Sequence, residues 1–266
     1  MAAEENAILT YVELLAELGM SRHLGDLEAT QELAELCHIE RDKVILDVGC
    51  GIGRTPCYVA KMYGCKVVGV DISEKMVDWS RKRAQGEGVE NMVEFRVADA
   101  QDLPFEDGSF DVVINESVLA FVKNRRKALS EYVRVTRPGG HVGLNESSWI
   151  KTPVPDEVVQ YFSSDMFAGV RMETVDTIER LLVESGLKDI KVSVHRTTAR
   201  GDTISRLRYY GPRGIVLNVH RILSLYASSS AGRGALKEIL SKMPRSPKNL
   251  YDHYGYAIYV GRKSPL

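Results

Sequence analysis

An apolar run that ends in three closely spaced glycines is the feature that most constrains the fold of this chain. Val44 to Val48 form the run, with one carboxylate at Asp47, and Gly49, Gly51 and Gly53 follow. Such a run bounded by glycines predicts a buried strand that turns sharply into a helix. Because glycine lacks a Cβ atom, a ligand can approach the main chain of such a turn closely. The turn therefore predicts a site for a nucleotide-like ligand.

Size and composition exclude several classes of protein. The 266 residues are 44% hydrophobic and 27% charged, which is typical of a soluble globular protein. No apolar run approaches the roughly 20 residues that cross a bilayer, and residues 1–20 lack the basic start of a secretory signal. Cys37, Cys50, Cys57 and Cys65 form no metal-ligand or disulfide pattern, so we expect no metal site and a cytoplasmic, reducing location.

Strand-like and helical patterns alternate along residues 43–145. The expected strands are residues 43–48, 66–71, 92–98, 110–115 and 141–145. The expected helices between them are residues 55–62, 74–85 and 124–136. Strands and helices that alternate at this spacing predict an α/β fold with a parallel sheet covered on both faces.

The flanking regions are expected to be mainly helical. Helices are predicted at residues 6–20, 27–37, 155–169 and 174–186, strands at 188–197 and 256–260, and mostly helix from 200 to 248. No repeat or linker interrupts the chain, which predicts a single domain over residues 1–266. We expect an N-terminal helical lid (1–40), a cofactor-binding core (41–150) and a C-terminal half (151–266) with a helical insertion at about 200–250.

Charge is unevenly distributed. The formal net charge is −1, yet residues 196–250 hold eight Arg and three Lys against one Asp and one Glu, a net of +9. Such asymmetry is typical of a surface for an anionic partner or substrate. A solvated helical face that pairs with acids elsewhere in the fold explains it equally well.

The spacing of the glycines decides which nucleotide-like ligand fits. A dinucleotide fingerprint, G-x-G-x-x-G, would need its third glycine at Arg54 or, counted from Gly51, at Pro56. No Gly-Lys-Ser/Thr follows, which excludes a phosphate-binding P-loop. Asp47 would repel a pyrophosphate but attract an ammonium or sulfonium group. S-adenosylmethionine carries both of these groups and an adenosine.

Four segments in order carry a wider resemblance: residues 44–60, 67–73, 93–113 and 131–140. With these segments the chain resembles the class I S-adenosylmethionine-dependent methyltransferases, over roughly residues 40–150. The resemblance implies a Rossmann-like, doubly wound, mostly parallel sheet of seven strands. Helices would cover both faces, the last strand would be antiparallel, and helical segments would form a lid. The cofactor would be S-adenosyl-L-methionine and the product S-adenosyl-L-homocysteine.

The resemblance also implies a role for the residues around the glycine turn. The turn backbone would lie along the methionine part of the cofactor, with Asp47 near its amino group. Asp71 would accept hydrogen bonds from both ribose hydroxyls, and Asp99 one from the adenine amino group. The implied cofactor contacts are His23, Asp47, Gly49, Cys50, Gly51, Gly53, Asp71, Ile72, Met76, Asp99, Ala100, Gln101, Asn115 and Glu116.

The methyl-transfer face is expected where the fourth strand ends, at Asn115, Glu116 and Ser117. Methyl transfer is an in-line displacement that needs alignment and desolvation more than acid–base chemistry. A base is needed only when the acceptor arrives protonated. The candidate catalytic residues are Tyr11, Glu116 and Glu146.

The N-terminal lid carries a weaker resemblance. Residues 23–30, HLGDLEAT, are similar to the "GGLEAT" string of phosphoethanolamine and related amine N-methyltransferases. Tyr11 could correspond to the tyrosine of the first helix in those enzymes, whereas Ala120 stands where they have a histidine. Because of that replacement, we expect a small-molecule or lipid-precursor acceptor, with an anionic group, rather than phosphoethanolamine itself.

Two other functions remain open. A nucleic-acid methyltransferase would explain the basic segment, although the chain has no recognisable RNA-binding module. It also has Asn115-Glu116-Ser117 where many base-amino methylases have Asn/Asp-Pro-Pro-Tyr/Phe. The other alternative is a cofactor-binding partner protein without catalysis. The acceptor atom (N, O, S or C) and the oligomeric state stay open.

Overall fold

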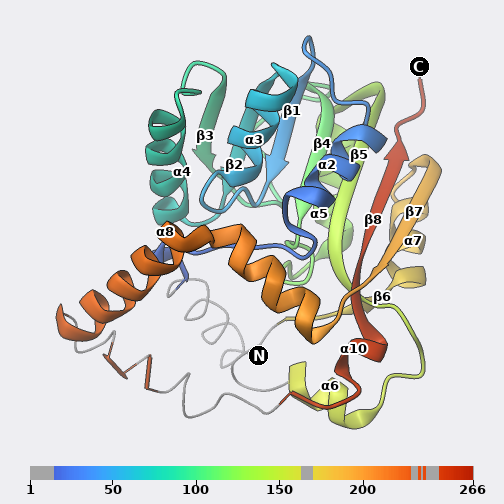
Figure 1. Ribbon diagram of the computed structural model, residues 1–266. Helices are drawn as coiled ribbons and strands as arrows, with labels where there is room; N and C mark the ends of the chain where they lie inside the picture. Colours follow the sequence, from blue (N-terminus) through green and yellow to red (C-terminus); the bar gives the residue numbers. More distant parts are fainter. Residues whose placement is uncertain (1–14, 163–169, 229–232, 235, 238–245, 266) are drawn as a thin grey trace.

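An open, twisted sheet forms the centre of the computed structural model, which describes residues 15–162, 170–228, 233–234, 236–237 and 246–265 (Figure 1). Its strands run in the order β3-β2-β1-β4-β5-β8-β7, and β6 pairs with β5. The strands are β1 (Val44–Val48), β2 (Lys66–Asp71), β3 (Val93–Val97), β4 (Phe110–Glu116), β5 (Thr136–Trp149), β6 (Glu173–Thr174), β7 (Lys188–Arg196) and β8 (Tyr254–Arg262).

The direction of the strands confirms the predicted fold class, although the described sheet has eight strands and not the seven expected. β1 to β5 pair in parallel, and β8 is antiparallel to both of its neighbours, β5 and β7. The strand order reverses between β1 and β4, and in open α/β sheets ligands bind beyond the carboxyl ends of the strands at such a point. The glycine turn follows β1 directly, so it lies at this position.

Two buried clusters, one on each face, hold the helices to the sheet. Along β1, Ile45 belongs to one cluster and Leu46 to the other, since successive strand side chains point to opposite faces. The first cluster takes residues from α2 (Asp26–Leu36), α3 (Arg54–Tyr63) and α4 (Glu74–Glu87). The second takes residues from α5 (Arg125–Val135) and α7 (Val175–Glu184).

The long helix α8 (Ala199–Ser228) crosses the molecule beyond the carboxyl ends of the strands, as Figure 1 shows in orange. It breaks at Gly211, whose backbone (φ 60°, ψ 173°) is not helical, and Pro212 follows. Two further short helices are α6 (Asp156–Phe162) and α10 (Leu250–His253). In the described part of the chain no helix is long and apolar enough to cross a membrane.

The lengths of β5 and β8 and the presence of β6 differ from the prediction. β5 covers 14 residues instead of the expected 141–145, because it follows α5 without a loop and pairs with β8 as far as Trp149. The two-residue strand β6 was not predicted, and β8 is longer than the expected 256–260. Residues 6–14 and 163–169, which the predicted helices included, lie outside the described residues.

Candidate active site

The glycine turn adopts a backbone that requires glycine. Gly49, Gly51 and Gly53 have φ values of 77°, 54° and 74°. A Cβ atom on Gly49 would lie 2.2 Å from Cγ2 of Val118, so the turn also packs too tightly for a side chain. The backbone N–H groups of Gly49 and Cys50 both donate to the carbonyl of Val70, at 2.7 and 2.9 Å. These contacts hold the turn against the end of β2.

Asp71 stands at the end of β2 and faces the turn. Its Oδ2 accepts from the N–H of Gly51 at 2.9 Å, and its Oδ1 accepts from the N–H of Ser73 at 2.9 Å. Burial raises the pKa of this carboxyl, and the two backbone hydrogen bonds oppose that rise. Each carboxylate oxygen can accept a second hydrogen bond. The predicted ribose contact is therefore compatible with the position of Asp71.

Asp47 is a buried carboxylate, and one of its two oxygens has no hydrogen-bond partner among the described residues. The residue is 2% exposed, and Oδ2 accepts no hydrogen bond from any described residue. Burial, followed by the nearby Glu116 and Asp71 carboxyls, raises its pKa well above the ordinary value. A buried polar atom without a partner costs free energy. A cationic or hydrogen-donating ligand at this point would remove that cost.

Further buried polar atoms without a hydrogen-bond partner among the described residues belong to the neighbouring strands β4 and β5. Asn115 Oδ1 and Ser117 Oγ lie at the end of β4, and Asn145 Oδ1 lies in β5. Ser117 also has a positive φ of 59°, which non-glycine residues adopt rarely. Native structures leave few buried polar atoms unsatisfied, so several of them on three adjacent strands, at the level where β1 and β4 end, indicate a ligand site.

Of the residues predicted to contact the adenosine, some are exposed to solvent and others are buried. Ile72 is 65% exposed, whereas Met76 is buried against Ala16 and Ile52. Asp99 accepts from the backbone N–H of Gln101 at 2.8 Å and from its side-chain amide at 3.2 Å, and Ala100 is buried. Met76 therefore packs against other residues of the chain, and Asp99 accepts hydrogen bonds from Gln101. Their contacts to a cofactor stay predictions.

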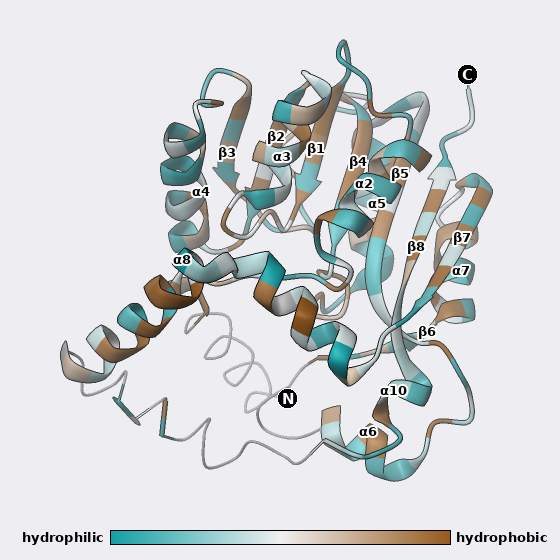
Figure 2. Ribbon diagram, in the orientation of Figure 1, coloured by the Kyte–Doolittle hydropathy of each residue, from teal (hydrophilic) through white to brown (hydrophobic). Residues whose placement is uncertain are grey.

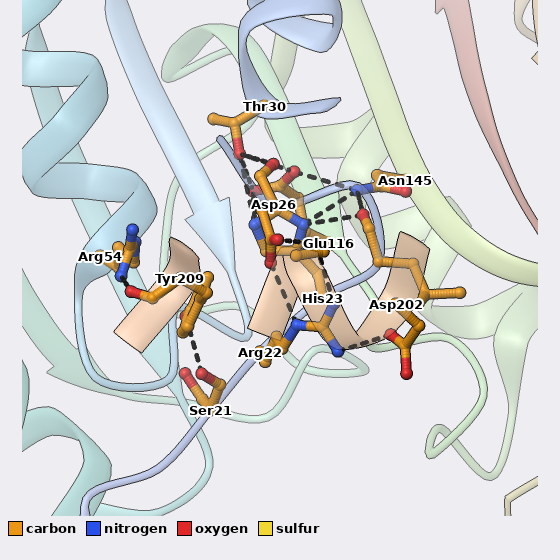
Figure 3. A network of polar contacts seen from close by, with 12 residues as sticks. Ser21, Arg22, His23, Asp26, Thr30, Arg54, Glu116, Asn145, Asp202 and Tyr209 are labelled. Atoms are coloured by element: carbon orange, nitrogen blue, oxygen red, sulfur yellow. Dashed lines mark hydrogen bonds and ion pairs between the residues drawn. The ribbon is translucent and has the colours of Figure 1, made fainter. Parts of the chain in front are cut away.

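Glu116 lies at the centre of a polar network that the sequence did not predict (Figure 3). Its Oε2 accepts from Thr55 Oγ1 at 2.6 Å and lies 3.5 Å from Nε2 of His23. Its Oε1 accepts from Thr30 Oγ1 at 3.1 Å and from Asn145 Nδ2 at 3.3 Å. The carboxylate thereby connects the lid segment, α2, α3 and β5.

His23 and Asn115 are likewise engaged within the chain. Nδ1 of His23 lies 3.1 Å from Asn145 Nδ2, and Asn115 donates to the hydroxyl of Tyr132 at 2.9 Å. The "LEAT" string contains Thr30, so the lid resemblance was a signal for part of this network. Nothing in the local pattern indicated Thr55 or Asn145.

Glu146, the third predicted catalytic residue, holds the loop after β4. Its Oε1 accepts from the backbone N–H groups of Val118 and Leu119, each at 2.9 Å. Complete burial raises its pKa to about 7, and those hydrogen bonds oppose the rise. The structure thus places Glu146 under the expected methyl-transfer face. Tyr11, the remaining predicted catalytic residue, lies outside the described residues.

Helix α8 contacts the segment of residues 18–25, which packs over the glycine turn. Arg22 donates to Asp202 at 2.8 Å and to Asp26 at 3.1 Å, and all three side chains are largely buried. The hydroxyl of Tyr209 donates to the carbonyl of Ser21 at 2.7 Å, and the Arg54 guanidinium lies 3.9 Å above its ring (Figure 3). α8 and residues 18–25 therefore cover the turn together.

The described residues hold no group of three or more His, Cys, Asp or Glu side chains that could bind a metal ion. The polar groups that the site offers are carboxylates, amides, hydroxyls and backbone N–H groups. This donor set suits a cationic organic ligand.

Comparisons with known proteins agree with this geometry. Residues 46–144 match the family model of the methyltransferase domain. Norajmaline N-methyltransferase from Rauvolfia serpentina is 30% identical over 162 residues, which cover 58% of this chain and 55% of that protein. The chain spans about half the length of the curated relatives it matches first, between 51% and 57%.

Solved structures share the fold at lower identity. The [4+2]-cyclase SpnF has a TM-score of 0.70 at 20% identity, covering 100% of this chain and 96% of that one. Haemonchus contortus phosphoethanolamine N-methyltransferase 2, with phosphomonomethylethanolamine and S-adenosylhomocysteine, has a TM-score of 0.66 at 22% identity, covering 97% and 57%. These likenesses show the fold alone, since one fold hosts many reactions.

Proposed function

We propose that this chain, whose residues 46–144 match the family model of a methyltransferase domain, is a class I S-adenosylmethionine-dependent methyltransferase that methylates a small-molecule acceptor. The observation that carries the proposal is the unpartnered buried oxygen of Asp47, in the strand that leads into the glycine turn, together with further such atoms where β4 ends. Asp47 Oδ2, Asn115 Oδ1 and Ser117 Oγ are all buried there without a hydrogen-bond partner among the described residues. A ligand with an ammonium and a sulfonium group satisfies such a site.

When bound, S-adenosylmethionine supplies an electrophilic methyl group on its sulfonium. The residues of this chain then act by holding and shielding the reactants. Asp47 would hold the amino group and Asp71 the ribose hydroxyls, while Ile72 would offer an apolar surface for the adenine. α8 and residues 18–25 exclude water from the site, and desolvation favours displacement at a cationic centre.

We propose that Glu116 and Glu146 hold neighbouring groups of the site in place and do not transfer protons. Glu116 already interacts with Thr30, Thr55, Asn145 and His23. The carboxyl of Glu146 is occupied by backbone N–H groups of the loop. Tyr11 stays a proposed catalytic residue that would reach the acceptor from the lid.

The acceptor is proposed to be a small molecule or lipid precursor with an anionic group. Two observations support this class: the basic balance of residues 196–250, and the likeness to an enzyme solved with phosphomonomethylethanolamine. In this scheme residues 1–40 form the lid, residues 41–150 hold the cofactor, and residues 151–266 select the acceptor. A reducing compartment such as the cytoplasm suits the four buried, unpaired cysteines.

Calorimetry with S-adenosylmethionine and S-adenosylhomocysteine tests the cofactor, and a metabolite-pool screen with a labelled methyl donor tests the acceptor. We expect saturable cofactor binding and label transfer to one small, anionic fraction. No binding at millimolar cofactor would refute the methyltransferase function. Binding without transfer to any fraction would favour a partner protein without catalysis.

A further inference from the structure

A cavity of about 360 Å³ lies at the opposite end of the sheet from the glycine turn. It is bordered by the start of β5, the start of β7 and the end of β8, which Figure 1 shows at the upper edge of the sheet. Leu36 and Val260 give it an apolar part. No residue of the proposed active site contributes to it.

Basic side chains from four parts of the fold converge on this cavity. His38 follows α2, His141 lies on β5, Lys191 on β7 and Arg262 on β8, and all four line it. The acidic residue of the lining is Asp189. Within the described ranges, no carboxylate forms an ion pair with Lys191 or Arg262. Arg262 Nε donates to the carbonyl of Gly139 at 3.4 Å, which leaves its two terminal nitrogens for a ligand.

Several groups that can donate hydrogen bonds or carry positive charge lie close together here. The His38 and His141 rings lie 5.4 Å apart. Burial, followed by the nearby His38, Lys43, Arg262 and Lys191, lowers the pKa of His141 to about 4. With Lys191 and Arg262 in the same lining, the cavity offers an anion two permanent charges and two imidazole rings.

The backbone shapes the cavity. The register of β7 shifts between Lys188 and Lys191, and Asp189 in this bulge has a positive φ of 53°. Bulges redirect side chains at sheet edges. Gly139, with a φ of 78°, leaves the space beside Arg262 free of a side chain.

We propose that this cavity binds the phosphate group of a small phosphorylated molecule. Arg262 would take two phosphate oxygens with its planar guanidinium, Lys191 would add a second positive charge, and the histidines would donate hydrogen bonds. A metal ion is disfavoured because the described side chains around His38 and His141 include no ligand cluster for one. The site is independent of the proposed methyl transfer.

The test is a titration followed by the ring signals of His38 and His141 in NMR spectra, with inorganic phosphate and with phenyl phosphate as probes. Chloride keeps the ionic strength constant. We expect saturable shifts with both probes, and tighter binding of phenyl phosphate because its ring contacts Leu36 and Val260.

Variants locate the site. Removing a charge-assisted hydrogen bond changes affinity by about tenfold, so Arg262→Gln and Lys191→Gln should each weaken phosphate binding by that factor. Lys61→Gln, an exposed lysine on α3, makes the same change in charge and should have no effect. Unsaturable shifts, equal shifts with chloride alone, or unchanged affinity in Arg262→Gln would each overturn the proposal.

Discussion

Asp71 is the residue whose removal tests the cofactor site most directly. Its carboxylate holds Gly51 and Ser73 and has capacity left for two more donors. We predict that Asp71→Ala weakens S-adenosylmethionine binding at least about tenfold while the fold survives, measured by calorimetry and circular dichroism. Asp78→Ala, which removes an exposed carboxylate on α4, should leave affinity unchanged. Wild-type affinity in Asp71→Ala would show that the ribose contact is misassigned.

Gly49 combines a positive φ with a close neighbour, and Gly88 separates these two effects. Both have positive φ, at 77° and 69°, but a Cβ atom on Gly88 meets nothing within 4 Å. We predict that Gly88→Ala lowers the free energy of unfolding by about 1 kcal/mol, from backbone strain alone. Gly49→Ala should cost more, because the new methyl group collides with Val118. Equal costs in denaturant unfolding would mean that the turn relaxes freely.

The raised pKa of Glu146 predicts that the free energy of unfolding depends on pH. Its pKa is 4.5 ordinarily and about 7 in the folded chain, so between these values the folded state binds more protons than the unfolded state. The free energy of unfolding therefore falls as the pH rises from 4.5 to 7, by about 3 kcal/mol from this group. Glu146→Gln should remove that decline in urea unfolding, and the exposed Glu40→Gln should not. A parallel decline in Glu146→Gln would contradict the assignment.

Some site residues could be predicted from the sequence and others could not. Asp47 and Asp71 end strands whose apolar runs are local patterns, so their common edge follows from a parallel sheet. The partners of Glu116 are different, because Thr30 lies 86 positions away along the chain. The distance between Asn145 and His23 is 122 positions. Contacts at such separations depend on how the lid packs, which no local pattern records.

The bounds of helices and strands were predicted well where the hydrophobic periodicity and the turn residues indicated the same element. β2 was predicted with its observed bounds, and the helix after Ser73 starts with that residue accepting from the N–H of Met76. β5 was underestimated because Pro138 and two glycines in its first half resemble a turn. β6 has two residues, too few for any periodic pattern.

The lid depends on ion pairs that can be broken one at a time. Arg22 connects Asp26 and Asp202 while only 12% of its side chain is exposed, and losing one partner of a buried pair is strongly destabilising. We predict that Arg22→Ala speeds hydrogen exchange of residues 199–210 at least about tenfold, with the sheet unaffected. Arg208→Ala, whose pair with Glu28 is exposed, is the control and should change little. Unchanged exchange in Arg22→Ala would mean that α8 is held by other contacts.

Charge asymmetry is the property of the whole molecule that the fold reinterprets. The +9 of residues 196–250 suggested an anionic partner, but part of that charge faces inward. Arg221 donates to the carbonyls of Leu18 and Gly19, and its guanidinium lies 4.3 Å above the ring of Trp79. Figure 2 shows that α8 also carries apolar residues along its length, so its exposed surface is not uniformly basic.

This inward use of arginine predicts weak binding to nucleic acid. Binding to phosphate backbones needs a row of free cations, and each neutralised phosphate adds nearly one unit to the slope of log K against log salt. We expect no gel shift of single-stranded RNA at 150 mM salt below about 10 µM protein, and a shallow slope at lower salt. Tight binding with a slope for six or more phosphates would instead establish the nucleic-acid methyltransferase. In that case neutralising Arg200 and Arg213 on α8 should abolish the shift while cofactor affinity stays unchanged.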